Sequence, residues 1–198
     1  GRYMNLPNKL TIARVIMVPF FVLFLVNITI PHHIIIALGI FALASFTDHL
    51  DGRIARKHNL ITNFGKFLDP LADKILVISA LICFVYLGWT NVWFLIVIVA
   101  REFMVSAVRL IAADNGKVVA ANVWGKIKTI SQMVAILVIL ILQYLRELMS
   151  LNLMPTFASC ELVFYIIGEC FVGICVFFTI LSGIIYLKDN WGIMKNSK

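Results

Sequence analysis

The sequence contains two apolar runs joined by a charged stretch: residues 34–56 read IIIALGIFALASFTDHLDGRIAR and residues 68–88 read LDPLADKILVISALICFVYLG. Each run is about as long as a helix that crosses a bilayer, which needs roughly 20 mostly apolar residues. Each also carries two aspartates at the end nearest the other run. Because the stretch between them is short and polar, we predict two neighbouring antiparallel membrane helices whose acidic ends meet.

The remaining sequence continues this apolar pattern. Of the 198 residues 62% are hydrophobic and 14% are charged, and the mean hydropathy is +0.98. Soluble domains are usually nearer half apolar and a quarter charged, so one small core cannot bury this much apolar surface. We predict an all-α integral membrane protein with six transmembrane helices; the alternative is a chain whose fifth or sixth helix is fused or missing. The expected spans are 11–29, 34–56, 68–88, 91–112, 126–146 and 161–187.

The chain begins Gly1-Arg2-Tyr3 before a Met4 that reads like a native start. We interpret residues 1–3 as an expression remnant and expect a single membrane domain over residues 4–198. Residues 5–11 are expected to form a short interfacial helix before the first span. No small-residue cleavage site follows the first apolar run, so we expect this run to remain as a membrane span.

Lysine and arginine indicate the orientation of the spans. They gather in four regions that fall on one side of a six-span chain, and the opposite connections hold only Arg146 as a clear basic residue. By the positive-inside rule, both termini and the basic loops are expected in the cytoplasm. The net charge of +7 suits anionic lipid, whereas scattered basic residues do not indicate nucleic-acid binding. The four regions are 2–14, 53–66, 117–128 and 188–198.

The four aspartates predict a metal site. Asp48 and Asp51 are three residues apart and Asp69 and Asp73 are four apart, so each pair shares a helix face. Four carboxylates at one membrane depth repel one another, and such residues are usually functional. Divalent cations prefer oxygen ligands, and two ions could bridge a phosphate. The alternative is that the aspartates cap helices and pair with nearby cations, which we favour for one pair but not for four residues at this spacing.

Small residues accompany the carboxylates. On a helix Asp48, Gly52 and Ala55 lie along one stripe, which lets a bulky ligand approach the backbone; close helix packing is the alternative reading. Arg56 lies one turn beyond Gly52, and its forked donors suit a phosphate. The four cysteines lie within or beside apolar stretches without a CxxC pair, and we interpret them as small apolar residues. They are Cys83, Cys160, Cys170 and Cys175.

A known family carries this pattern. The string Asp48-x2-Asp51-Gly52-x2-Ala55-Arg56-x8-Gly65-x3-Asp69-x3-Asp73 resembles, position for position, the signature of the CDP-alcohol phosphatidyltransferases. His49 stands at a variable position. Further motifs are similar to bacterial members whose acceptor is sn-glycerol 3-phosphate: Asn5-x-Pro7-Asn8-x-Leu10-Thr11-x2-Arg14, Asp69-Pro70-Leu71-Ala72-Asp73-Lys74, Arg101-Glu102-Phe103 and Gly125-Lys126-x-Lys128-Thr129.

The resemblance implies an enzyme that transfers a phosphatidyl group from CDP-diacylglycerol to an alcohol and releases CMP. It also implies a pair of Mg²⁺ or Mn²⁺ ions, a homodimer, contact with membrane lipids and a place in the bacterial inner membrane with the active site at the cytoplasmic interface. Asp73 is implied both as a metal ligand and as the general base. The other implied metal ligands are Asp48, Asp51 and Asp69; the implied CDP-binding residues are Gly52, Ala55, Arg56 and Gly65, with Asn8 and Thr11 nearby.

If the acceptor is sn-glycerol 3-phosphate, its dianion needs a cationic pocket, for which we predict Arg101, Arg109, Lys117 and Lys126. Anchoring to anionic lipid is the alternative for each, and an intramembrane ion pair with Glu102 is a further one for Arg101. Other possible acceptors are phosphatidylglycerol, serine and inositol phosphate. A carboxylate-based ion transporter is the competing class, but it would spread carboxylates through the membrane depth. A purely structural scaffold explains the pattern less well still.

Overall fold

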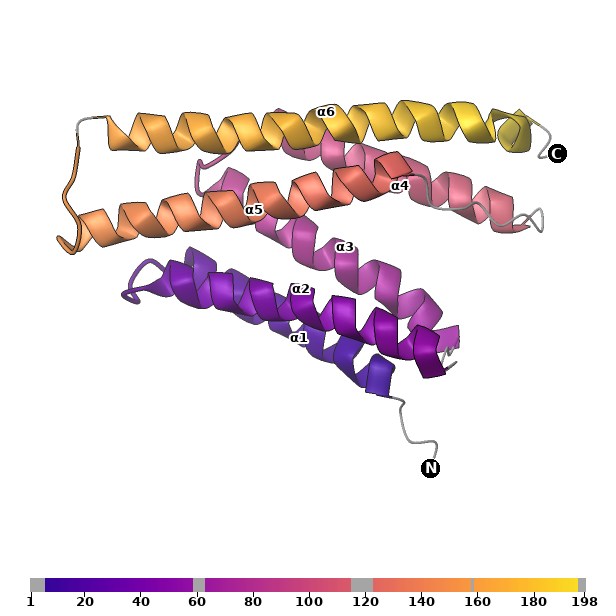
Figure 1. Cartoon of the computed structure of the whole chain (residues 1–198), viewed down its shortest axis with the longest axis horizontal. Coiled ribbons are helices and arrows are strands. Elements are labelled where there is room, and N and C mark those ends of the chain that lie inside the picture. Colours follow the sequence, from indigo (N-terminus) through magenta and orange to yellow (C-terminus); the bar gives the residue numbers. More distant parts are fainter. Residues whose placement is uncertain (1–5, 59–62, 115–122, 158, 196–198) are drawn as a thin grey trace. The chain divides into compact units, whose positions relative to one another are not determined.

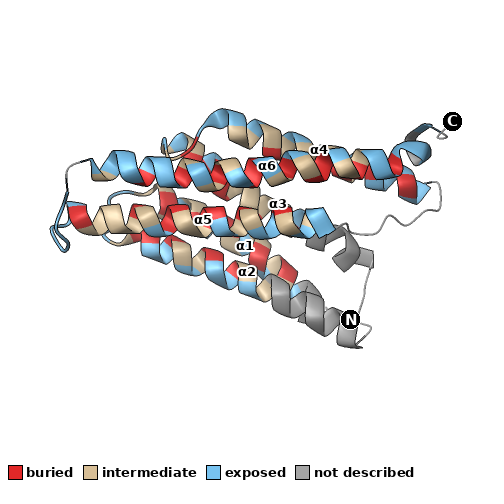
Figure 2. Cartoon of the chain, turned by 45° about the horizontal axis from the view of Figure 1, so that its top comes forward, coloured by how far each residue is buried: buried red, intermediate tan, exposed pale blue. Residues whose placement is uncertain are grey.

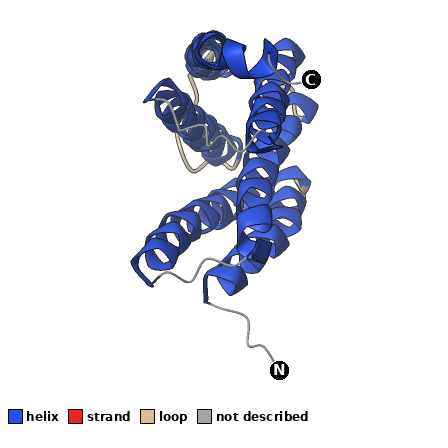
Figure 3. Ribbon diagram, turned by 90° about the vertical axis from the view of Figure 1, so that its right-hand side faces the viewer, coloured by secondary structure: helices blue, strands red, loops and turns tan. Residues whose placement is uncertain are grey.

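The computed structural model of the chain consists of helices joined by short connections (Figure 1). It describes residues 6–58, 63–114, 123–157 and 159–195, without the side chains of 6–8, 48–58, 63–70, 73, 193 and 194. These ranges contain no strand (Figure 3). The all-α prediction is confirmed, and the alternative with a fused or missing fifth or sixth helix is wrong. The helices are α1 Leu6–Val26, α2 His33–His58, α3 Asn63–Tyr86, α4 Val92–Asp114, α5 Val123–Ser150 and α6 Cys160–Lys195.

Within the described residues, three helices are long and apolar enough to cross a membrane: α1, α5 and α6. The described parts of α2 and α3 add shorter apolar stretches, His33–Thr47 and Lys74–Tyr86. Large apolar side chains lie exposed along the helices, including Phe103 and Phe177 at 71% and 61%, and exposed residues line α4 and α6 in Figure 2. Lipid tails are a suitable environment for such surfaces, and helices satisfy their own backbone groups there. The chain is therefore a multi-pass membrane protein.

The separate interfacial helix expected over residues 5–11 is not present in the described part of this segment. Instead α1 runs unbroken from Leu6 to Val26. Pro7 falls in the first turn, where a missing N–H removes no helical hydrogen bond. No glycine or proline follows until Pro19, so nothing ends the helix between the interface and the apolar run.

The helices fall into two compact units, the first formed by residues 1–87 and 140–160. In it α1 packs along both α2 and α3, which also contact each other. The rings of Phe21 and Phe41 lie 5.7 Å apart between α1 and α2, and both residues are fully buried. The end of α5 is tied to the start of α2, since the Glu147 Oε1 atom accepts a hydrogen bond from the His33 N–H at 3.2 Å.

The second unit comprises residues 88–139 and 161–198. Its α4 begins with a cap in which Asn91 Oδ1 accepts the N–H of Trp93 at 3.0 Å, and Glu169 Oε1 accepts the N–H of Asn91 at 2.9 Å. Val105, Val108 and Tyr186 form a buried cluster between α4 and α6. This unit thus joins α4, the first part of α5, and α6.

Candidate active site

The structure places the four predicted aspartates on α2 and α3, on either side of the four-residue connection 59–62. Asp48 and Asp51 lie ten and seven residues before the last residue of α2, and Asp69 and Asp73 lie six and ten residues after the first residue of α3. At a rise of about 1.5 Å per residue, these positions are roughly 9–15 Å inside the two helix ends. The four positions therefore lie at matched depths on two helices that contact each other.

The side chains of these aspartates lie outside the described residues, as do those of the predicted CDP-binding residues on the same helices. Gly52, Ala55 and Arg56 belong to α2, and Gly65 belongs to α3. The side chain of Asn8, on α1, is likewise outside the described part. Their assignments remain predictions, now placed on defined helices.

Of the predicted site residues in the first unit, Thr11 is the one whose side chain the structure describes. It is fully buried on α1. It lies 15 residues before the end of α1, and Asp48 lies 15 residues after the start of α2. Helix α1 packs along α2, and the short connection 27–32 joins them. Thr11 and Asp48 therefore lie at about the same distance along their helices from this connection, roughly 22 Å. This placement supports Thr11 as a neighbour of the aspartates.

Arg14, a position of the N-terminal motif and one of the basic residues that indicate orientation, is almost completely buried. It is 1% exposed and lies three residues after Thr11, on the same side of α1. A buried guanidinium is costly in apolar surroundings unless charge or hydrogen bonds compensate it. The sequence carries a signal that Arg14 lies near the predicted site, since it follows Thr11 at helical spacing inside an apolar run.

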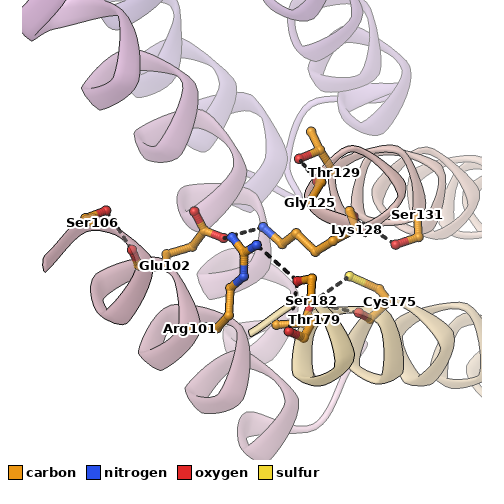
Figure 4. A network of polar contacts seen from close by, with 10 residues as sticks. All are labelled: Arg101, Glu102, Ser106, Gly125, Lys128, Thr129, Ser131, Cys175, Thr179 and Ser182. Carbon is orange, nitrogen blue, oxygen red and sulfur yellow. Dashed lines mark hydrogen bonds and ion pairs between the residues drawn. The ribbon is translucent and has the colours of Figure 1, made fainter. Parts of the chain in front are cut away.

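Arg101 lies in the second unit, within a network of polar contacts between α4, α5 and α6 (Figure 4). Its Nη1 donates to Glu102 Oε1 at 3.0 Å and its Nη2 donates to Ser182 Oγ at 3.0 Å. Lys128 Nζ donates to the same Glu102 oxygen at 2.5 Å. The structure therefore contains the ion pair of Arg101 with Glu102 that was the alternative to a phosphate-binding role. The hydrogen bond to Ser182 and the pairing of Lys128 with Glu102 were not predicted.

The other predicted acceptor residues differ in how they are placed. Arg109 on α4 and Lys126 on α5 are exposed, which leaves both accessible to a ligand. Lys117 lies outside the described residues. Among the side chains that the structure describes, no group of three or more metal-ligating residues converges. The four aspartates therefore remain the metal-site candidates, and a set of carboxylate oxygens fits a hard divalent cation.

Comparison with known proteins identifies the family. Residues 4–181 match the model of the CDP-alcohol phosphatidyltransferases, a range that contains the whole aspartate signature. The chain belongs to the CDP-alcohol phosphatidyltransferase family. The resemblance inferred from the aspartate spacing is thus confirmed, and the transporter and scaffold alternatives are set aside.

Several CDP-alcohol phosphatidyltransferases are similar to this chain over most of their length. The chain is 41% identical to the CDP-diacylglycerol–glycerol-3-phosphate 3-phosphatidyltransferase of Bacillus subtilis (strain 168), over 98% of both chains. It is 36% identical to the protein of the same name from Rickettsia felis, over 93% of this chain and 94% of that one. It is also 43% identical to the "Probable phosphatidylglycerophosphate synthase" of Mycobacterium tuberculosis (strain ATCC 25618 / H37Rv), over 69% of this chain and 66% of the relative.

Proposed function

We propose that the protein is a phosphatidylglycerophosphate synthase, which transfers the phosphatidyl group of CDP-diacylglycerol to sn-glycerol 3-phosphate. The products are phosphatidylglycerophosphate and CMP. The observation that carries the proposal is the aspartate signature, placed at matched depths on two contacting helices of a CDP-alcohol phosphatidyltransferase. The choice of acceptor is supported by the 41% identity, over 98% of both chains, to a relative named for glycerol 3-phosphate.

In the proposed reaction the free primary hydroxyl of glycerol 3-phosphate attacks the phosphorus that bears the diacylglycerol. A new P–O bond forms to the acceptor, the P–O bond to the CMP phosphate breaks, and CMP leaves with that electron pair. Asp73 accepts the proton of the attacking hydroxyl, which requires the carboxylate to lie within hydrogen-bonding reach of it. The transfer therefore needs no oxidant or reductant.

The remaining aspartates hold divalent metal in this proposal. Asp48, Asp51 and Asp69, with Asp73, supply the oxygen ligands for a pair of Mg²⁺ or Mn²⁺ ions. Such ions, when bound, neutralise the pyrophosphate and the departing phosphate. Carboxylates on two neighbouring helices also suit a lipid substrate, because a site roughly 9–15 Å inside the helix ends can receive a headgroup whose acyl chains stay in the bilayer.

The nucleotide and the acceptor are bound by separate groups. The small residues Gly52, Ala55 and Gly65 allow the CDP group to approach the backbone of α2 and α3. The Arg56 guanidinium of α2 pairs with a phosphate of the CDP group. Arg109 of α4 and Lys126 of α5, together with Lys117 from the sequence that joins these helices, bind the phosphate of the acceptor. The CDP group consists of Gly52, Ala55, Arg56, Gly65, Asn8 and Thr11, and the acceptor group of Arg109, Lys117 and Lys126. Arg101, predicted with them, is instead hydrogen-bonded to Glu102 and Ser182.

We further propose that all six helices cross the bacterial inner membrane and that both termini and the basic connections lie in the cytoplasm. The distribution of lysine and arginine supports this orientation. In α4, which carries Arg101, Glu102 and Arg109, the ion pairs within the helix bundle reduce the cost of crossing. We also propose that the protein forms a homodimer, which the family resemblance implies.

The proposal is tested by incubating the purified protein with CDP-diacylglycerol, Mg²⁺ or Mn²⁺ and one acceptor at a time, and measuring released CMP. The acceptors are glycerol 3-phosphate, phosphatidylglycerol, serine and inositol phosphate. We expect CMP release with glycerol 3-phosphate. Release only with another acceptor would contradict the acceptor assignment, and no release with any of them would contradict the enzymatic proposal.

A further inference from the structure

The Arg101 side chain extends from α4 toward Lys128 of α5 and Ser182 of α6 (Figure 4), and glycines of both helices lie close to it. A Cβ atom placed on Gly125 of α5 would lie 3.7 Å from its Nη2. A Cβ atom placed on Gly183 of α6 would lie 3.4 Å from its Cγ. Ser182, next to Gly183, accepts a hydrogen bond from Nη2 and donates its own to the Thr179 carbonyl. The guanidinium is thus hydrogen-bonded to groups of α4 and α6 and lies beside Gly125 of α5.

Glu102 is the charged group that joins this network. One of its oxygens, Oε1, accepts from both Arg101 and Lys128, whose side chains are 12% and 5% exposed. Coulomb attraction is strong at this depth, and removing the carboxylate would leave two buried cations facing each other. Since Glu102 and Arg101 belong to α4 and Lys128 to α5, the carboxylate links α4 to α5.

Two of the proposed acceptor cations lie on the same two helices, closer than this ion pair to the helix ends that residues 115–122 join. Arg109 lies seven residues after Glu102 on α4, which is about two turns and nearly the same face. Lys126 lies two residues before Lys128 on α5 and therefore on a different side of that helix, and both Arg109 and Lys126 are exposed. Two cations from different helices bind one phosphate dianion only when the helices keep a defined axial offset. A misplacement of about 1 Å is enough to weaken such an arrangement strongly.

We propose that Glu102 is a positioning residue for the acceptor. Through its ion pairs with Arg101 and Lys128 it holds α4 and α5 in the register at which Arg109 and Lys126 bind the phosphate of glycerol 3-phosphate. Arg101 and Lys128 then stabilise this register and are not phosphate ligands. This inference rests on the proposed function, since it concerns the acceptor of that reaction.

The test is the steady-state kinetics of Glu102→Gln with each substrate varied in turn. The amide keeps the shape but loses the charge that holds both cations. We expect the KM for glycerol 3-phosphate to rise at least about tenfold, while the KM for CDP-diacylglycerol changes less than about twofold. The second KM is the internal reference because the CDP-binding residues lie on α1, α2 and α3. Glu102→Asp keeps the charge at a shorter reach and should give an intermediate KM for glycerol 3-phosphate.

Glu169→Gln is the matched control. It makes the same substitution in the same unit, at a carboxylate that links α6 to the start of α4 through the Asn91 N–H. It lies outside the network, so both KM values should stay at the wild-type level. If Glu102→Gln raises both KM values equally, or changes only the fraction of folded enzyme, the carboxylate has a purely structural role and the inference is wrong.

A second variant covers the case in which Glu102→Gln does not fold. Glu102→Gln with Lys128→Met restores the net charge of the network, and we expect it to fold with a raised KM for glycerol 3-phosphate. A wild-type KM in this double variant would overturn the inference. If the wild-type protein does not use glycerol 3-phosphate, both the proposed function and the inference are wrong. If the wild type is active and both Glu102 variants keep its KM for glycerol 3-phosphate, only the inference is wrong.

Discussion

At the scale of single residues, Gly183 decides how closely α6 can approach the side chains of α4. A Cβ atom there would lie 3.2 Å from Met104 Cε and 3.4 Å from Arg101 Cγ. The first contact is tighter than ordinary van der Waals spacing and the second is at its lower limit. A larger side chain must therefore displace Met104 or Arg101, or separate the two helices.

Gly183→Leu should lower the free energy of unfolding by about 1–3 kcal/mol, the usual effect of overpacking a well-filled contact. Gly173→Leu is the matched control, because the same helix leaves open space around Gly173. Thermal unfolding in detergent measures both variants. An equal melting temperature for Gly183→Leu and Gly173→Leu would show that the contact does not constrain the packing.

The aspartates carry the second residue-scale prediction. Asp51→Asn and Asp69→Asn should each lower CMP release at least about a hundredfold, because the amide loses the charge that holds a divalent cation. Asp189→Asn, at an exposed position of α6, should keep wild-type turnover. Circular dichroism verifies that each variant is folded, and substantial turnover in either signature variant would refute the metal-ligand roles.

Sequence spacing could predict that the four aspartates lie on two helices joined by a short connection, while the convergence of their side chains stays a prediction. It could not predict the Glu102–Lys128 pair, whose partners are 26 residues apart and meet only through the packing of α4 and α5. Arg14 was visible as a cation inside an apolar run, but its near-complete burial depends on contacts between helices and cannot be read from spacing.

At the scale of elements, the hairpin of α1 and α2 is closed by polar contacts at the connection. Asn27 Oδ1 accepts from the N–H and the hydroxyl of Thr29 at 3.2 and 2.6 Å. Glu147 Oε1 satisfies the N–H of His33, the first residue of α2. Glu147 therefore joins the end of α5 to the start of α2 within the first unit.

Glu147→Ala should lower the free energy of unfolding by about 1–3 kcal/mol, since it leaves a largely buried N–H without its acceptor. Glu147→Gln retains an accepting oxygen and should lose less. The measurement is thermal unfolding, with CMP release per folded molecule expected to be unchanged in both. If the alanine and glutamine variants are equally stable, the hydrogen bond to His33 does not hold the two helices together.

Helix existence and order were predictable from the apolar runs, whereas helix ends were not. The apolar pattern marks the residues that suit lipid, but backbone hydrogen bonding continues into polar sequence beyond them. Thus α2 extends to His58 and α6 to Lys195, past the predicted ends of the spans. For the same reason α1 begins at Leu6 and absorbs the segment expected to be a separate helix.

At the scale of the whole molecule, composition and the distribution of cations make a prediction about topology. We expect the connection between α1 and α2 and the connection between α5 and α6 to face the outside of the cell. In a cysteine-free background, Thr29→Cys and Asn152→Cys should react with an impermeant maleimide added to intact cells. Lys188→Cys should react only after the membrane is opened. The reverse labelling pattern would contradict the orientation.

The central claim is that this membrane protein joins a phosphatidyl group to glycerol 3-phosphate at a carboxylate-held metal site. The most direct measurement is mass spectrometry of the lipid formed from CDP-diacylglycerol and glycerol 3-phosphate by the purified protein. We predict phosphatidylglycerophosphate in a one-to-one ratio with CMP, lost on chelation of divalent metal and restored by Mg²⁺ or Mn²⁺. Absence of this lipid with metal present, or its undiminished formation after complete chelation, would contradict the account.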